Sequence, residues 1–292
     1  MAGKFYYGGQ AVIEGVMMRG RKAMVTAVRR PGGDLAMDTR LLGGIYAGWM
    51  RRTPLLRGVI VLIEVMVLGM KTLLYSANVS LEEEKAEISG WLVWLLVGVS
   101  LAVAVVLFFM APLFLTKLLG SYVTSPVMFS LIEGLIRVAI MIVYLWAIGL
   151  MPDIKRYFAY HGAEHKTVNA YEGGVPLEVE AVKNYSTAHV RCGTSFLFTV
   201  VIIAIIIFAV VGLPATWMLV LSRIVLLPVI AALAYEVIYL SGRHADNVFV
   251  RVLMAPGRWL QRLTTREPDD AQLEVAIAAL KGAVEMDEAK AT

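Results

Sequence analysis

Cysteine, histidine and charged residues are all scarce in this chain of 292 residues. The sequence holds one cysteine, Cys192, and four histidines, and 17% of its residues are charged. A single cysteine excludes an intrachain disulfide, so cysteine pairing gives no indication of the compartment. The first ten residues contain no long apolar run, and we therefore expect no cleavable signal peptide and insertion through an internal segment.

Nucleotide-binding loops, internal repeats and low-complexity segments are also absent from the sequence. Apolar residues, in contrast, are abundant: 59% of the chain is hydrophobic and the mean hydropathy is +0.70. This is the composition of a membrane protein rather than of a soluble domain, and a lipid bilayer is the partner that it predicts.

Four segments are long enough to cross the hydrocarbon core of a bilayer, which takes about 20 apolar residues. They are Trp91–Leu115, Leu131–Met151, Phe196–Trp217 and Leu219–Leu240. Pro112 and Pro228 are expected to kink the first and the last of them. Residues 91–240 therefore predict a four-helix membrane domain.

Basic residues gather in three regions outside these segments, residues 1–53, 152–195 and 241–292. The loop 116–130 holds only Lys117. Because basic regions stay on the inner side, four spans predict a multi-pass protein of the inner membrane with all three regions, and both termini, in the cytoplasm. This distribution accounts for the net charge of +4, so we expect no nucleic-acid partner.

Residues 54–75 are apolar but carry three charges, Arg57, Glu64 and Lys71, at intervals of seven. A helix drifts only about 20° per heptad, so the three side chains form one stripe. Such a stripe favours an interfacial or re-entrant helix over a lipid-exposed span. Glu64 fits a salt bridge along the stripe and a role in a site equally well.

The N-terminal residues 1–53 predict a cytoplasmic β-rich element. Runs rich in Val, Ile and Thr alternate with turns that contain Gly and Pro, which is typical of an antiparallel meander. Its strands are expected at Gln10–Arg19, Ala23–Arg30 and Leu35–Leu42. Glu14 then lies in mid-strand, where its carboxylate faces either solvent or the site.

The tail, residues 241–292, has two expected parts. The first is a basic amphipathic segment along the inner membrane surface, and the second is a soluble helix with Leu273, Ile277 and Leu280 on one face. The predicted fold class is therefore predominantly α and polytopic. It comprises four transmembrane helices, an interfacial amphipathic helix and a small N-terminal antiparallel β element.

The densest polar stretch runs from Tyr160 to Glu172, within the expected cytoplasmic loop 152–195. Its residues His161, Glu164 and His165 read H-x-x-E-H. In a helix the two histidines share a face one turn apart, a spacing that can chelate one divalent cation, with zinc the expected metal. Glu164 would then act as a general base on a metal-bound water, or orient a histidine.

A catalytic zinc site needs a third protein ligand and an open position. The sequence offers His189, Cys192, Glu14 or Glu172 for that ligand, and spacing does not choose among them. If both helix histidines bind together with His189 and Cys192, the site is closed and structural. This is the competing interpretation of the same residues.

Further polar residues fit a substrate site or a polar network, Glu64 and Glu172 among them. Asn169 and Arg191 could hold an oxyanion, although loop polarity explains them equally well. Glu236 lies inside the last predicted span, where a carboxylate indicates either a function or a structural ion pair. His244 follows that span and is expected near the inner surface.

Five stretches resemble a known family: GGQAVIEGVMMRG at 8–20, YHGAEHKTVNAYE at 160–172, RCGTSF at 191–196, GRHADN at 242–247 and LTTREPDDAQLEVAIAAL at 263–280. They look like the YqhQ-like bacterial membrane proteins, a domain of unknown function labelled a predicted metal-dependent enzyme. The resemblance runs almost from end to end and implies a bacterial, metal-dependent membrane enzyme. Family members often read H-P-R-C-G where this chain has Val190, which leaves the histidine and the cysteine in place.

Two functions are predicted. The leading one is a metal-dependent hydrolase that acts at the cytoplasmic face on a membrane-associated lipid head group or peptide. The alternative is a non-enzymatic membrane scaffold, insertion factor or transport component with a structural metal or a polar network. A metal with three protein ligands would favour the first, and a closed four-ligand metal or none would favour the second.

Overall fold

A computed structural model describes residues 5–43, 49, 53–81, 90–119, 123, 125–213, 215–244 and 247–289. The N-terminal part is an antiparallel sheet in the order β1-β2-β3-β4. Its strands are β1 (Gly8–Val12), β2 (Gly15–Arg19), β3 (Ala23–Arg29) and β4 (Leu35–Leu41). The predicted N-terminal β element is confirmed, with one strand more than the sequence pattern predicts.

The first predicted strand is in fact a hairpin. Ile13 and Glu14 form the turn between β1 and β2, where Val12 pairs with Gly15. Glu14 has φ 51°, the left-handed conformation that tight hairpin turns use. The prediction that Glu14 lies in mid-strand is therefore wrong, because a turn of two residues interrupts the apolar pattern too briefly to be seen in it.

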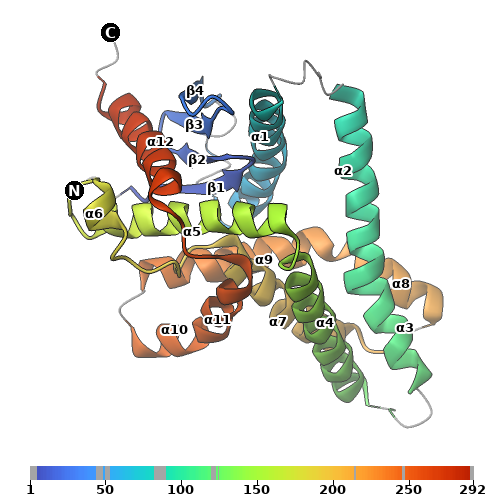
Figure 1. The fold of residues 1–292 in the computed structure, drawn as a ribbon. Helices are drawn as coiled ribbons and strands as arrows, with labels where there is room; N and C mark the ends of the chain where they lie inside the picture. The colour runs from blue at the N-terminus through green and yellow to red at the C-terminus, as the bar shows by residue number, and fades with distance from the viewer. Residues whose placement is uncertain are drawn as a thin grey trace.

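The rest of the described chain is mainly helical (Figure 1). The helices are α1 (Leu56–Ser80), α2 (Gly90–Val105), α3 (Ala111–Leu118), α4 (Pro126–Ile148), α5 (Pro152–Glu172), α6 (Val179–Val182), α7 (Gly193–Val211), α8 (Thr216–Val225), α9 (Leu227–Arg243), α10 (Val248–Leu253), α11 (Ala255–Thr264) and α12 (Asp270–Glu288). A π-helical turn, Val106–Met110, joins α2 to α3. The predicted predominantly α fold is confirmed.

Four helical stretches of the described chain are long and apolar enough to cross a membrane. The first is α1, the second is the continuous run of α2 and α3, the third is α4 and the fourth is α7. The pair α8 and α9 makes a fifth if it is one span, with a bend of 46° between its halves. The predicted segment Leu219–Leu240, with its expected kink at Pro228, corresponds to these two helices. Pro228 follows the break and lacks the N–H that would continue the ladder, as expected of a kink.

Pro112 acts on the helical run from α2 to α3 in the same way. Its missing N–H leaves the carbonyl of Phe108 without a helical partner, and the ladder widens into the π-helical turn. Arg137 of α4 donates from Nε to that carbonyl at 2.7 Å. The π-helical turn before Pro112 is thus joined to α4 by a hydrogen bond from a buried arginine.

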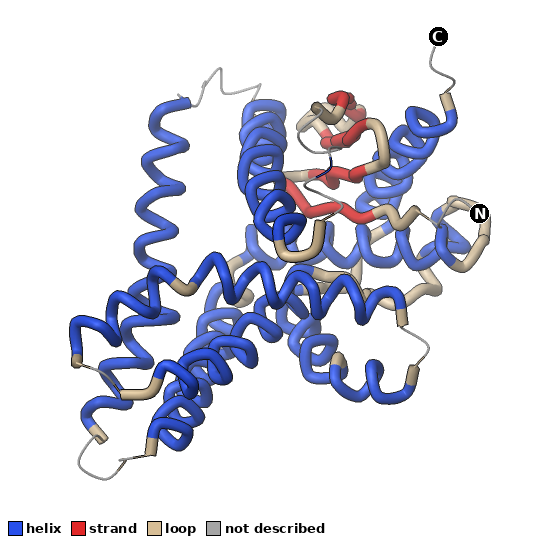
Figure 2. The backbone as a smooth tube through the Cα atoms, turned by 180° about the vertical axis from the view of Figure 1, so that it is seen from behind, coloured by secondary structure: helices blue, strands red, loops and turns tan. Residues whose placement is uncertain are grey.

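Helix α5 lies across the middle of the molecule. In Figures 1 and 2 the sheet and α12 lie on one side of it, and α4 and α7 lie on the other. The largest hydrophobic cluster joins α5, α12 and the sheet through buried side chains such as Ala163 and Leu280. The predicted C-terminal helix is confirmed, because Leu273, Ile277 and Leu280 are all buried.

Candidate metal centre

One stripe of α5 carries polar residues that the sequence singles out. His161, His165, Asn169 and Glu172 recur three or four positions apart, so their side chains leave the helix on one face. That face meets the loop between α6 and α7, whereas Ala163 packs into the hydrophobic cluster with α12 and the sheet. The helix therefore separates an apolar core from a polar site.

Both histidines are oriented by backbone carbonyls. His161 Nδ1 lies 2.8 Å from the carbonyl oxygen of Thr264, and His165 Nδ1 lies 2.5 Å from that of Thr187. A carbonyl can only accept, so each neutral ring carries its proton on Nδ1 and presents a lone pair on Nε2. Metal-binding histidines typically have such an outer partner.

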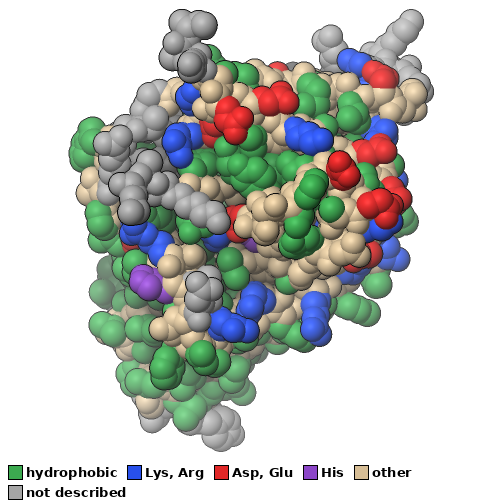
Figure 3. Space-filling view, turned by 90° about the vertical axis from the view of Figure 1, so that its left-hand side faces the viewer, with side chains coloured by type: hydrophobic (Ala, Val, Ile, Leu, Met, Phe, Trp, Pro, Cys, Tyr) green, Lys and Arg blue, Asp and Glu red, His purple; other side chains and the backbone are tan. Residues whose placement is uncertain are grey.

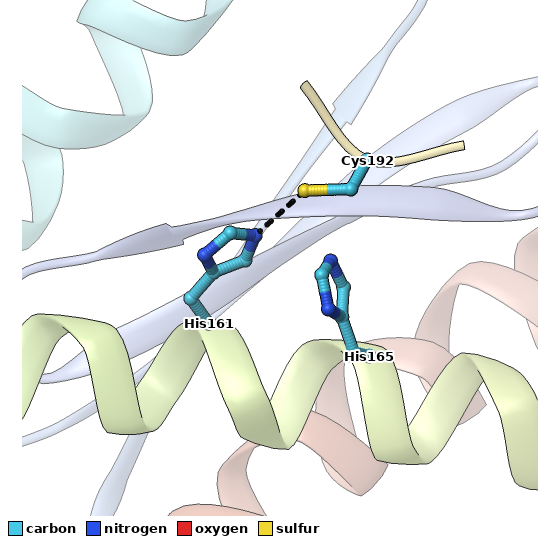
Figure 4. Close-up of side chains that lie close together, drawn as sticks. All are labelled: His161, His165 and Cys192. Atoms are coloured by element: carbon cyan, nitrogen blue, oxygen red, sulfur yellow. Dashed lines mark hydrogen bonds between the residues drawn. The ribbon is translucent and has the colours of Figure 1, made fainter. Parts of the chain in front are cut away.

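Cys192 completes the group. It lies at the N-cap of α7, where its Sγ accepts from the backbone N–H of Thr194. The same sulfur lies 3.3 Å from Nε2 of His161, and Figure 4 shows the three side chains converging. His165 and Cys192 are buried and His161 is partly exposed.

The donor set fits zinc. The ligand atoms of the three residues all lie within 4.8 Å of one another. A tetrahedral zinc ion with bonds of about 2.0–2.3 Å holds its ligand atoms roughly 3.3–3.8 Å apart, so side-chain movements of about 1 Å suffice. Two imidazoles and one thiolate are ligands that zinc accepts well, and three protein ligands leave a fourth position.

Glu164 lies beside this group. Its Oε1 accepts from the backbone N–H of Gly9 in β1 at 3.1 Å, and its Oε2 is 3.5 Å from Nε2 of His165. The side chain is 4% exposed. Burial, and secondarily the charge of Glu164, raises the pKa of the neighbouring Tyr157 to about 12. The carboxylate is thus buried and held by the sheet.

His189 lies next to the group and faces a different pair of residues. Its ring centre is 5.6 Å from that of His165, and its Nε2 lies 3.3 Å from Nη2 of Arg191 and 3.9 Å from Oε2 of Glu172. Glu172 also pairs with Arg191. Burial acts to raise the pKa of Glu172, but the hydrogen bond to His189 and the charge of Arg191 outweigh it and lower that pKa.

Hydrogen bonds from α5 and α11 shape the loop that carries His189 and Cys192. Asn169 donates to the carbonyls of Ser186 and Ala188 at 2.9 and 3.1 Å. Gln261 is fully buried; it accepts from the backbone N–H of His189 and donates to the carbonyl of the same residue, both at 2.8 Å. The loop is therefore held from two sides.

Glu14 lies apart from the three-residue group. It pairs with Arg156 of α5 through both carboxylate oxygens and accepts from the hydroxyl of Tyr160 at 3.2 Å. The side chain joins the β1–β2 turn to α5.

The other predicted polar residues also have partners on other elements. Glu236 of α9 forms a two-oxygen pair with Arg57 of α1, and Glu64 of α1 pairs with Arg19 of β2 at 2.5 Å. These pairs join α1 to α9 and to the sheet. His244 ends α9 and is exposed, with its Nδ1 3.0 Å from a carbonyl of its own helix.

Four residues position the site without being singled out by the sequence: Gly9, Thr187, Gln261 and Thr264. Three of them act through backbone atoms, which every residue supplies, so the sequence holds no signal for them. Gln261 acts through its side chain. A polar residue on the buried face of an amphipathic helix is the signal that could have found it.

The long apolar helices, the N-terminal sheet and the His-His-Cys group, which could hold a metal ion, define a multi-pass membrane protein with a candidate metal centre. The chain belongs to the DUF1385 family, described as proteins of unknown function, whose model matches residues 53–286. It is similar to the uncharacterised protein YqhQ of Bacillus subtilis (strain 168), with 37% identity in an alignment that covers 93% of this chain and 90% of the relative. No solved structure matches the chain. The family resemblance is confirmed.

Proposed function

We propose that this protein is a metal-dependent hydrolase with a membrane-associated substrate and a centre at His161, His165 and Cys192. The observation that carries the proposal is the donor set, in which both histidines present Nε2 because their Nδ1 atoms bond to carbonyls. Structural zinc sites have four protein ligands, whereas catalytic ones have three and keep a position for water or substrate. His189, the candidate fourth ligand, is engaged with Glu172 and Arg191 instead.

A bound metal would act as a Lewis acid and make a water molecule more acidic. Glu164 would accept the proton of the attacking water, because one oxygen lies 3.5 Å from His165 Nε2 and the other is held by Gly9. Arg191 lies 3.3 Å from His189 and pairs with Glu172, and its remaining N–H groups could bind an anionic group of the substrate.

We place this site on the cytoplasmic face. The sheet contacts α5 through Gly9 and Glu14, so these two polar elements lie on one side of the membrane. The chain between them must then cross the bilayer an even number of times. The continuous run of α2 and α3 supplies one crossing and α4 supplies a second, which leaves α1 in the interface. The basic residues put this side in the cytoplasm.

Metal content is the first test. Elemental mass spectrometry of the detergent-purified protein should find about one zinc or similar ion per chain. The double variant His161→Ala with His165→Ala should lose it. His244→Ala removes an exposed histidine outside the group and is the matched control, which should keep the metal. A wild-type protein without metal, even after reconstitution, would overturn the proposal.

Hydrolysis is the second test and separates chemistry from metal binding. Glu164→Gln should keep the metal and lose about 10²–10⁴-fold in rate against ester and phosphoester substrates in vesicles, the usual contribution of a general base. Full activity of this variant would exclude Glu164 as the base and leave the metal centre itself in place.

A scaffold or transport component is the second candidate function, and one observation favours it. Glu133 of α4 pairs with both Arg137 of the same helix and Arg223 of α8, and all three side chains are buried. Ionisable residues inside membrane helices commonly mark an ion or client path. Metal-free protein that copurifies with a membrane complex would favour this function over hydrolysis.

A further inference from the structure

Helix α10 presents apolar side chains outward. Val248, Phe249, Val252 and Leu253 are between 63% and 86% exposed, and Trp259 of α11 is 53% exposed. None of the side chains of α10 is fully buried. A short helix with its apolar residues turned outward gains little from packing on its own protein, and such segments typically lie in the headgroup region of a bilayer.

Arginines accompany these apolar residues. The stretch 243–266 contains Arg243, Arg251, Arg258, Arg262 and Arg266. Within the part of the chain that the structure describes, no ion pair uses any of the five. In Figure 3 Lys and Arg side chains lie above a mainly hydrophobic lower part, whereas most visible Asp and Glu lie higher up. The charge of the stretch therefore complements an anionic surface.

A small hollow that opens to solvent lies at this place. It is lined by Val190, Ser241, Val250, Arg251, Met254 and Arg258. Arg258 donates from Nη2 to the carbonyl of Arg251 at 3.0 Å, while its Nε is buried without a hydrogen-bond partner among the described residues. A buried donor without a partner is destabilising unless a ligand supplies an acceptor.

We propose that this hollow seats the phosphate of one anionic phospholipid. The phosphate would accept hydrogen bonds from Arg251 and Arg258, because the planar guanidinium matches phosphate geometry. The acyl chains would lie along Phe249 and Leu253. A phospholipid matches both the positive charge of the arginines and the exposed apolar side chains, whereas free phosphate would leave those side chains in water.

The hollow adjoins the loop of the candidate metal centre. Val190 lines the hollow and lies between His189 and Arg191 in the chain. Gly257 of α11 packs closely on Ser195 at the start of α7, where a Cβ would come within 3.1 Å of that residue. The hollow contains none of the three residues of the candidate metal group, so lipid binding does not depend on a bound metal.

Native mass spectrometry of the full chain in detergent tests the lipid seat directly, with equimolar phosphatidylglycerol and phosphatidylcholine added. We expect preferential retention of one phosphatidylglycerol per chain. Arg251→Gln with Arg258→Gln should weaken its retention about 25-fold, because each arginine near an anionic surface contributes a factor of about five. Lys183→Gln with Lys281→Gln removes the same charge at two exposed positions outside this stretch and is the matched control, which should change retention by less than about threefold.

Phe249→Ser provides a second variant that cannot disturb the core, because this side chain is 86% exposed. It should reduce phosphatidylglycerol retention several-fold while the protein keeps its preference over phosphatidylcholine. Three results would overturn the proposal: no preference for the anionic lipid, equal retention in the arginine double variant and its control, or displacement of the lipid by millimolar inorganic phosphate. If the arginine variant is misfolded by circular dichroism, the Phe249→Ser result decides.

Discussion

A single glycine sets the position of the candidate metal-binding histidines, because it allows a close approach of two backbones. A Cβ at Gly162 would lie 2.1 Å from the carbonyl oxygen of Arg266. The segment that approaches there also supplies the carbonyl of Thr264 to His161, and the N–H of Arg266 donates to the carbonyl of Phe158 at 2.9 Å. Glycine at position 162 therefore lets the end of α11 orient a histidine of α5.

Gly162→Ala tests this approach. The added methyl must push the segment 264–266 away, so we expect a loss of about 1–3 kcal/mol in the free energy of unfolding and a lower metal content. Gly98→Ala in α2, where a Cβ meets nothing within 4 Å, is the matched control. It should be neutral or stabilise the helix by up to about 1 kcal/mol. Equal unfolding temperatures for the two variants would contradict the prediction.

Among the helices, α4 and α8 are joined by charge as well as by apolar contact. Glu133 accepts from Arg137 one turn further along α4 and from Arg223 of α8, both at 2.6 Å, and each side chain is at most 2% exposed. Arg137 also bonds the carbonyl of Phe108, which Pro112 leaves free. A buried charge that loses its partner is strongly destabilising, so the three residues hold the helices in one arrangement.

Glu133→Gln should destabilise the protein by about 3–5 kcal/mol, because two buried arginines then lose their counter-charge. Glu274→Gln is the matched control: it also removes a carboxylate from a pair with an arginine, Arg29, but Glu274 is exposed and should cost at most about 1 kcal/mol. Unfolding followed by circular dichroism in nanodiscs measures both. Adding Arg223→Met to Glu133→Gln should restore part of the loss, and no rescue would argue against a charge-based coupling.

For the molecule as a whole, the arrangement of the sheet, α5 and α12 constrains how the chain threads the bilayer. These elements share one hydrophobic cluster, so they form a single body beside the membrane helices. Helix α1 contacts this body through Glu64 and Arg19, and it contacts α9 through Arg57 and Glu236. Arg57 and Glu64 thus face protein, whereas Lys71 is exposed, as are apolar side chains such as Ile63 and Val65.

Cysteine labelling with a membrane-impermeant maleimide tests the predicted topology. Met37→Cys in the sheet and Lys183→Cys in the loop after α6 should react only after cells are permeabilised, and Leu119→Cys after α3 should react in intact cells. The native Cys192 is 5% exposed and stays in place as an unreactive background. Labelling of positions 37 and 183 from opposite sides would mean that α1 crosses the membrane.

Local signals explain which parts of the fold were predictable. Apolar runs of about 20 residues predict membrane helices wherever they occur. The spacing of Leu273, Ile277 and Leu280 predicts the buried face of α12. The hairpin turn at Glu14 was not predicted, because a turn of two residues is too short to interrupt the apolar pattern visibly. The break before Pro228 was expected as a kink, but a single proline does not tell a gentle bend from one of 46°.

The candidate site was likewise predictable only in part. His161, Glu164 and His165 were found from spacing alone, since a helix brings residues four apart to one face. The third member of the group was left open among four residues, because spacing along the chain does not say which loop returns to a helix.

The sequence by itself therefore determined the membrane class, the apolar helices and the pair of histidines, since composition and helical periodicity are properties of neighbouring residues. Only the tertiary structure brought Cys192 into the group and turned His189 toward Glu172 and Arg191. It did so through Gln261 and the carbonyls of Thr187 and Thr264, contacts between segments far apart in the chain that no local pattern encodes.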